Sequence, residues 1–156
     1  SGSTGLLLHL WHGNSDFGFF GYSVSSAGDI DSDGFDDLIV GAYDADPNGL
    51  YGAGSVYLFS GYDGSTLYQL NGTSDYDYFG YSVSALGDVN GDSVNDFVIG
   101  AKGHDAVGLT NSGAAYVYSG ASGNLLHQFY GASNSLFFGF SVSGAGDVNG
   151  DGLKDV

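Results

Sequence analysis

Short hydrophobic segments separated by turn residues predict β-strands along the whole chain. From Phe20 to Gly28 larger side chains alternate with small ones, so that Phe20, Tyr22, Val24 and Ser26 should share one face. The segment Asp37–Ala42 reads Asp-Leu-Ile-Val-Gly-Ala, a continuous apolar run typical of a strand buried on both faces. The pattern predicts an all-β fold.

Two further strands complete the unit. A loop of Asp, Pro and Gly residues over 44–52 leads to a predicted strand at Gly54–Ser60. Asp63-Gly64 then forms a strong hairpin signal before a fourth strand at Thr66–Leu70. The last two strands should therefore be adjacent and antiparallel, which gives a four-stranded antiparallel meander.

The unit repeats every 59 residues, as shown by Phe20-Gly21, Phe79-Gly80 and Phe138-Gly139. We divide the chain into repeat 1 (1–59), repeat 2 (60–118) and a partial repeat 3 (119–156), or about two and two-thirds repeats. One meander cannot bury its apolar faces alone, so copies must stack, and this period favours the radial blades of a β-propeller. A ring of seven blades would need roughly 400 residues, so one chain gives an incomplete ring.

Composition narrows the function classes. The 18 acidic residues are all Asp, Lys102 and Lys154 are the only basic residues, and the net charge of −16 disfavours nucleic-acid binding. With 12 Tyr, 11 Phe and 42% hydrophobic residues, the chain should nevertheless fold. It contains no Cys for disulfides or thiolate metal sites, and no apolar run long enough to span a membrane.

Oxygen-bearing side chains alternate in a nine-residue loop between the first two strands of every repeat. They are Asp29, Asp31, Asp33 and Asp37, then Asp88, Asn90, Asp92 and Asp96, then Asp147, Asn149, Asp151 and Asp155. Carboxylates this close repel one another, and a cation removes the repulsion. Hard oxygen ligands without His or Cys favour Ca²⁺, so we predict one Ca²⁺ per repeat and up to three per chain.

Each loop position has an expected role. Positions one, three and five offer side-chain oxygens, position nine the closing carboxylate, and position seven a backbone carbonyl, from Phe35, Val94 or Leu153. Gly34 and Gly152 permit the sharp turn, whereas Ser93 replaces this glycine in repeat 2 and predicts a weaker site. Asp and Asn also populate ordinary β-turns, but one spacing repeated three times favours metal binding. An EF-hand is disfavoured because the twelfth-position Glu is missing and both flanks read as strands.

Two motifs, Phe-Gly-Tyr-Ser-Val-Ser and Gly-Asp-Ile-Asp-Ser-Asp-Gly-Phe-Asp-Asp-Leu-Ile-Val-Gly-Ala, resemble the FG-GAP repeat of integrin α-subunit propellers and related bacterial surface proteins. The resemblance covers nearly the whole chain. It implies that seven such repeats close into a ring, that each loop can hold one Ca²⁺, and that the propeller serves adhesion or ligand binding outside the cell or at its surface.

A binding scaffold is therefore the expected function. The ring would be completed by copies of the chain or by further blades, with strands left over at both ends, a fourth-type strand first and a first-type strand last. A protein or glycan ligand should contact the loops that differ between repeats, 43–52 and 102–112. The alternatives are a self-assembling structural surface repeat and a metal-dependent hydrolase. We expect no enzyme, because the four His residues stand in no recognisable acid/base setting.

Overall fold

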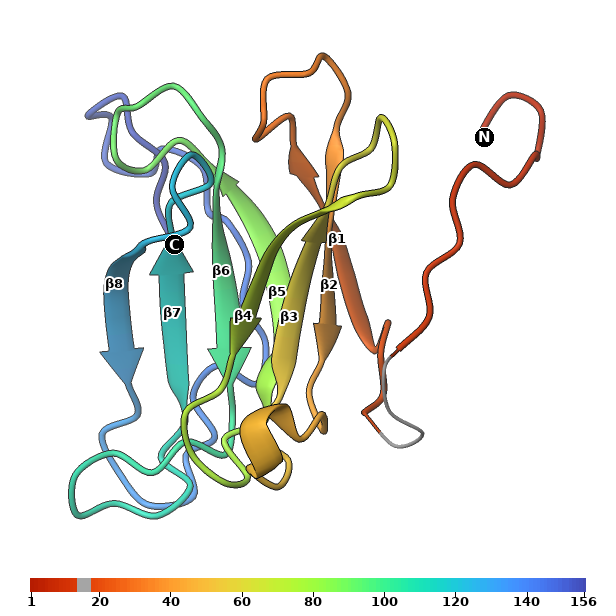
Figure 1. Cartoon of the computed structure of the whole chain (residues 1–156). Coiled ribbons are helices and arrows are strands. Elements are labelled where there is room, and N and C mark those ends of the chain that lie inside the picture. Colours follow the sequence, from red (N-terminus) through yellow and green to blue (C-terminus); the bar gives the residue numbers. More distant parts are fainter. Residues whose placement is uncertain (14–17) are drawn as a thin grey trace.

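The computed structural model describes residues 1–13 and 18–156 and contains two four-stranded antiparallel sheets that lie side by side (Figure 1). The first sheet has β1 (Ser23–Gly28), β2 (Asp37–Ala42), β3 (Ser55–Phe59) and β4 (Thr66–Asn71) in that order. The second has β5 (Phe79–Gly87), β6 (Asp96–Ala101), β7 (Ala114–Tyr118) and β8 (Leu125–Tyr130). A single 3₁₀ turn, η1 (Pro47–Gly49), precedes β3. The predicted all-β blades are confirmed.

The central strands follow the sequence pattern closely. Strand β2 has the predicted bounds, and every residue of its counterpart β6 is buried. Strand β2 pairs with β3 in a register that places Ile39 opposite Leu58, and β3 pairs with β4 as the predicted antiparallel hairpin. Continuous apolar runs thus become strands covered on both faces, since neighbouring strands satisfy their backbone groups while both rows of side chains are buried.

The first strand is shorter than predicted. It begins at Ser23 and not at Phe20, because its pairing with β2 starts only at Ser23, opposite Gly41. In the second sheet β5 does begin at Phe79, but its pairing with β6 shifts register between Phe79 and Ser82. The alternation itself holds within β1, where Val24 and Ser26 are exposed.

The main core lies between the two sheets and contains the fully buried side chains of Ile39, Leu58, Phe97 and Ile99. Glycines let the sheets approach. A Cβ on Gly41 would lie 2.1 Å from the carbonyl oxygen of Gly80, and one on Gly100 would lie 1.9 Å from that of Gly139. The contact therefore recurs at the repeat step of 59 residues and sets the spacing of successive repeats.

The ends of the chain correct one prediction. Residues 5–13 form no strand. After β8 the described chain has only two isolated bridges, one between Gly113 and Phe138 and one between Gly146 and Asp155. The expected leftover strands are thus not formed, because a strand needs a partner for its backbone groups. The N-terminal segment is held by side chains instead: the Trp11 indole donates to Gly64 O at 2.9 Å and stacks on Phe59 at 4.9 Å.

Lys102 inserts among aromatic rings from β5, from the β4–β5 connection and from the third repeat. Its ammonium lies 3.6 Å from the centroid of the Tyr81 ring and 5.4–5.6 Å from those of Tyr78 and Phe140. A cation over the electron-rich face of a ring is attracted electrostatically. This side chain therefore ties the third repeat to the second sheet.

Replacing Lys102 by Met should lower the free energy of unfolding by about 0.5–2 kcal/mol, since the variant keeps the stem but loses the cation–π contacts. Urea denaturation in calcium would measure the change. Lys154→Met makes the same change in net charge at an exposed position and should cost less. Equal losses in the two variants would contradict the role assigned to the rings.

Among the residues that the structure describes, no helix is long and apolar enough to cross a membrane.

Candidate metal centres

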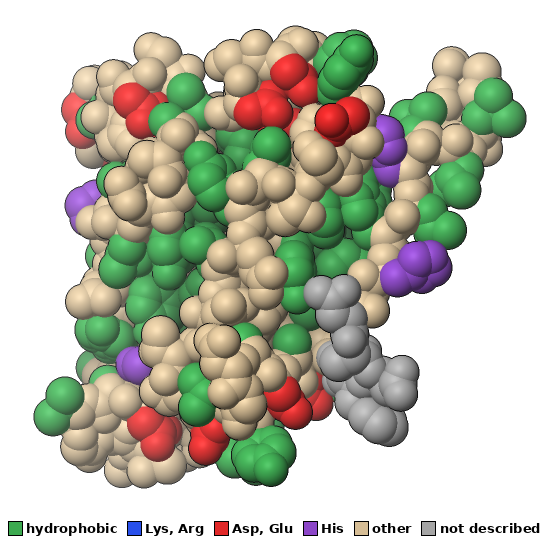
Figure 2. Space-filling view, viewed as in Figure 1, with side chains coloured by type: hydrophobic (Ala, Val, Ile, Leu, Met, Phe, Trp, Pro, Cys, Tyr) green, Lys and Arg blue, Asp and Glu red, His purple; other side chains and the backbone are tan. Residues whose placement is uncertain are grey.

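The three Asp-rich loops lie at one end of the sheets. The β1–β2 and β5–β6 connections and the final loop at 147–155 share this end, whereas the β2–β3, β4–β5 and β6–β7 connections lie at the opposite end (Figure 1). Acidic side chains are visible at both ends of the molecule (Figure 2). The fold thus places equivalent loops of successive repeats next to one another.

The closing carboxylate of every loop is fixed by a backbone donor at position two. Ile30 N donates to Asp37 Oδ2 at 2.8 Å, and the same bond recurs from Val89 to Asp96 at 2.9 Å and from Val148 to Asp155 at 2.8 Å. Asp37 and Asp96 are 2% and 0% exposed. A buried carboxylate needs such donors, so position nine is both a structural anchor and a candidate ligand.

The first carboxylate of every loop accepts from position six across the turn. The bonds are Gly34 N to Asp29 at 3.0 Å, Ser93 N to Asp88 at 2.8 Å and Gly152 N to Asp147 at 2.9 Å. Position six is left-handed in all three loops, with φ of 92°, 70° and 93°. Ser93 therefore keeps the turn and its hydrogen bond, although glycine suits this backbone conformation better.

The middle positions are tied in the same way in every loop. The backbone N–H at position five donates to the side chain at position three, and that at position seven donates to the carboxylate at position five. Phe35, Val94 and Leu153 thus act as N–H donors. The role predicted for their carbonyl groups stays a prediction.

In the first loop three carboxylates converge. Ligand oxygens of Asp29, Asp31 and Asp37 all lie within 4.8 Å of one another. Oxygens that each lie roughly 2.3–2.6 Å from a shared Ca²⁺ can be no farther apart than about twice that distance, so the set fits such an ion. Asp33 is outside this set: its carboxylate accepts from Phe35 N at 2.8 Å and from Ser60 Oγ at 3.1 Å.

The second and third loops have an amide at position three. The side-chain nitrogen of Asn90 donates to Asp92 Oδ2 at 2.9 Å, and that of Asn149 donates to Asp151 Oδ2 at 3.0 Å. Within the described parts of the chain, their carboxylates form no cluster of three like that of the first loop. Each of these loops offers three carboxylates and one amide oxygen.

The surroundings of the loop carboxylates shift their pKa in opposite directions. Backbone N–H groups, first those of Ser93 and Gly152, lower the pKa of Asp88 and Asp147 respectively. Burial raises the pKa of Asp96 despite N–H donors from Val89 and Gly120. For Asp31, partial desolvation and then the charges of its loop neighbours raise the pKa. Some loop carboxylates are thus held ionised next to others whose negative charge is disfavoured. A divalent cation would reduce the repulsion between these charges.

The sequence profile of the FG-GAP repeat matches residues 20–59 and 79–118, each of which contains one Asp-rich loop and its flanking strands. The chain belongs to the FG-GAP repeat family. Each matched segment of the FG-GAP repeat also covers the Phe-Gly pair and the buried second and third strands. Each matched segment therefore contains the first three strands of one observed sheet, while the fourth strands, β4 and β8, lie just after it.

Several curated relatives are integrin α-subunits. Integrin alpha-5 of Xenopus laevis is 35% identical over 164 aligned positions, which cover 96% of this chain and 15% of that protein. Integrin alpha-2 and integrin alpha-E of Mus musculus are 35% and 39% identical over 74 positions, or 42% of this chain and 6% of each of those proteins. The chain thus spans about 15% of the first relative's length.

The FG-GAP loops rely on one pair of residues that the sequence reasoning did not assign to the site. Gly61 N donates to Asp37 Oδ1 at 3.0 Å and Gly120 N to Asp96 Oδ1 at 3.1 Å. The preceding Ser60 and Ser119 donate hydroxyl bonds to the position-five carboxylates at 3.1 and 3.4 Å. The sequence does carry a sign of this pair, because Ser-Gly recurs at the repeat step of 59 residues.

Replacing Ser93 by Gly should stabilise the second loop by about 0.5–1 kcal/mol. A left-handed residue with a Cβ costs roughly 1–2 kcal/mol, part of which is offset by the greater freedom of glycine in the unfolded chain. The reverse change, Gly152→Ser, should destabilise the third loop. Chemical denaturation of both variants would test this, and a less stable Ser93→Gly protein would contradict it.

Proposed function

We propose that each FG-GAP loop of this chain binds one Ca²⁺ and that the chain is a propeller-blade module for adhesion or ligand binding outside the cell or at its surface. The observation that carries the proposal is the convergence of Asp29, Asp31 and Asp37 in a loop whose hydrogen-bond framework recurs in the other two repeats. The units proposed are repeats 1–59, 60–118 and 119–156.

The proposed ligands are the side chains at positions one, three, five and nine and the carbonyl at position seven. They are Asp29, Asp31, Asp33, Phe35 and Asp37, then Asp88, Asn90, Asp92, Val94 and Asp96, then Asp147, Asn149, Asp151, Leu153 and Asp155. This set contains only oxygen donors, which favours Ca²⁺ over Zn²⁺ or Cu²⁺. Asp33 would have to turn away from Ser60 to take part.

Bound calcium would supply positive charge and a cross-link. Three ions would add six positive charges and bring the net charge from −16 to about −10. Each ion would join the end of the first strand of a blade to the start of the second, because the closing carboxylates Asp37 and Asp96 are the first residues of β2 and β6. The ions would thus do what disulfides do in other small extracellular domains.

Ligand recognition is proposed at the end opposite the calcium loops. The β2–β3 and β6–β7 connections lie there (Figure 1) and differ between repeats in sequence, with η1 in the first only. Variable loops on a rigid scaffold commonly carry binding. The integrin names of the relatives support adhesion as the role.

Further blades are expected on both sides of the two sheets. Leu6, Leu7, Leu8 and Leu10 are exposed at one end of the chain, and Phe138, Phe140 and Val156 at the other. Exposed apolar surface of this extent marks a contact face. Copies of the chain, or further blades of a longer protein, would cover it.

Light scattering with millimolar calcium, and again with a chelator, tests the proposed module. A discrete oligomer that depends on calcium would support ring completion by blades that the ion stiffens. A monomer of unchanged mass in both conditions would overturn self-completion of the ring.

The same exposed faces favour a second candidate, a structural surface repeat that polymerises by stacking blades. Calcium-dependent fibres under the electron microscope would favour this function over closed rings. We propose a binding module and not an enzyme. A metal-dependent hydrolase would require hydrolytic activity that is lost on removing the metal, which assays with phosphate and peptide esters would reveal.

A further inference from the structure

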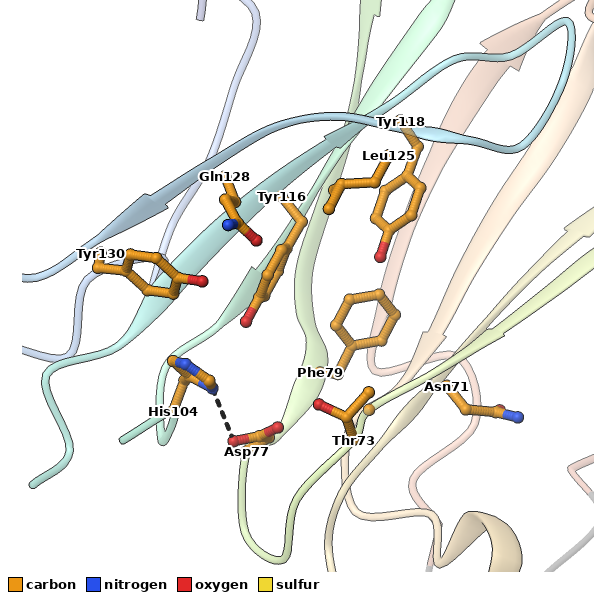
Figure 3. A pocket seen from close by; sticks show the side chains of 11 residues that line it. Asn71, Thr73, Asp77, Phe79, His104, Tyr116, Tyr118, Leu125, Gln128 and Tyr130 are labelled. Carbon is orange, nitrogen blue, oxygen red and sulfur yellow. Dashed lines mark hydrogen bonds and ion pairs between the residues drawn. The ribbon is translucent and has the colours of Figure 1, made fainter. Parts of the chain in front are cut away.

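A cavity of about 250 Å³ lies between β7–β8 and the β4–β5 connection, and the β6–β7 loop borders it. Strands β7 and β8 supply Tyr116, Tyr118, Gln128 and Tyr130, the β4–β5 connection supplies Asp77, and the β6–β7 loop supplies His104 (Figure 3). The floor includes the buried ring of Phe79, which lies 5.8 Å from that of Tyr116. The wall is therefore aromatic, with polar groups at its edge.

Two polar residues of this cavity, Asp77 and His104, have no polar counterpart in the equivalent cavity. An equivalent cavity of about 220 Å³ lies against the first sheet, where Tyr57 and Gln69 stand 59 residues before Tyr116 and Gln128. At the positions of Asp77 and His104, however, the first cavity has Gly18 and Ala45. Packing between blades thus explains why both cavities exist. It does not explain why the second cavity has Asp77 and His104 where the first has Gly18 and Ala45.

Asp77 and His104 form a fixed pair. His104 Nδ1 lies 3.0 Å from Asp77 Oδ1, and Asp77 Oδ2 accepts from Ser74 N at 3.1 Å. Asp77 is 4% exposed, and the His104 ring stacks on Tyr130 with centroids 5.4 Å apart. Each carboxylate oxygen therefore has one partner from the protein, and the pair is held in place at the edge of the cavity.

Other polar groups face the cavity without protein partners. In the described residues, no protein hydrogen bond involves the hydroxyls of Tyr116, Tyr118 and Tyr130 or the side-chain amide of Gln128, and none of their polar atoms is sealed from solvent. In Figure 3 the hydroxyl of Tyr118 points toward Phe79, and that of Tyr130 points toward Tyr116. Burial raises the pKa of Tyr116 and Tyr118, so both phenols are neutral donors.

Charge and size restrict the ligand. Neither Lys102 nor Lys154 lines the cavity, and its one carboxylate, Asp77, disfavours an anion. The volume is below the roughly 300–1,000 Å³ of sites for drug-sized molecules and suits one small ring. Aromatic faces suit the apolar C–H face of a pyranose, while the free phenols and amide suit its hydroxyls.

We propose that this cavity binds a single neutral sugar ring, held between the aromatic wall and the hydroxyls of Tyr116 and Tyr130. The inference rests on the binding role proposed above and names the ligand class for its variable-loop end. The same chemistry occurs in a free monosaccharide and in the terminal residue of a glycan.

Isothermal titration calorimetry of the full chain in millimolar calcium tests this proposal. The probes are the methyl glycosides of galactose, mannose and N-acetylglucosamine, and trisaccharides that end in each. We expect a dissociation constant on the order of 1 mM for one of these sugars, as a ligand of about a dozen heavy atoms permits. Tighter binding of the trisaccharide would identify a glycan terminus, and equal binding a free sugar.

The double variant Tyr116→Phe/Tyr130→Phe keeps both rings and should weaken binding at least about tenfold by removing two hydroxyls. Tyr57→Phe, the matched change in the equivalent cavity, should leave binding unchanged. No heat with any probe, or equal effects of the two changes, would overturn the sugar site. Circular dichroism and calcium titration of the same samples would show separately whether the fold and the proposed calcium function are intact.

Discussion

Chelating calcium is expected to lower the free energy of unfolding by several kcal/mol and to shift the thermal midpoint down. An ion that binds only the folded chain stabilises it by about 2.7 kcal/mol per site when its free concentration is 100 times the dissociation constant. No such cage exists in the unfolded chain, so binding and folding are linked. Differential scanning calorimetry over a range of free calcium would measure the shift.

A pair of single changes in the first loop separates calcium binding from loss of negative charge. Asp31 is exposed, belongs to the carboxylate cluster, and accepts one hydrogen bond, from Asp33 N at 3.1 Å. Asp36 is also exposed but lies outside the cluster. Asp31→Ala should reduce the calcium-dependent stabilisation, whereas Asp36→Ala should preserve it. Equal calcium dependence in both variants would contradict the proposed first site.

Replacing Gly100 by Val should destabilise the protein by about 3 kcal/mol or more. A Cβ at this position would lie 1.9 Å from Gly139 O and 2.4 Å from Ser82 Oγ. The nearer neighbour is backbone and cannot rotate away, so β6 and the segment around Gly139 in the third repeat would have to separate. Overpacking in well-packed regions typically costs about 1–3 kcal/mol, and a backbone clash lies at the upper end.

Urea denaturation in saturating calcium would measure this loss. Gly2→Val is a matched change at a position with no neighbouring atom within 4 Å and should alter stability by a few tenths of a kcal/mol at most. A Gly100→Val protein as stable as the parent chain would mean that successive repeats do not pack through these glycines.

Much of the fold could be predicted from local pattern. The run Asp37–Ala42 became β2 with unchanged bounds, and the Asp63-Gly64 turn joined β3 and β4 as expected. Both signals are local: a short apolar run between turn residues, and an Asp-Gly pair that here lies within the longer turn at 60–65. The spacing of the Asp-rich loops likewise located the candidate metal centres, because every loop is contiguous in sequence.

The features that were missed depend on partners distant in the chain. The start of β1 moved from Phe20 to Ser23 because pairing with Gly41 of β2 begins there. The terminal strands did not form, since strand formation depends on neighbours and not on pattern alone. The support of Asp37 by Gly61, and the pairing of Asp77 with His104, join residues 24 and 27 positions apart. Only the folded chain brings these groups together.

A calorimetric titration of the calcium-free chain with Ca²⁺ is the most direct test of whether the Asp-rich loops are calcium sites. We predict saturable binding with up to three ions per chain, and the loss of one ion in the Asp31→Ala variant. A titration without saturable binding, or a stoichiometry that this variant leaves unchanged, would contradict calcium binding by these loops.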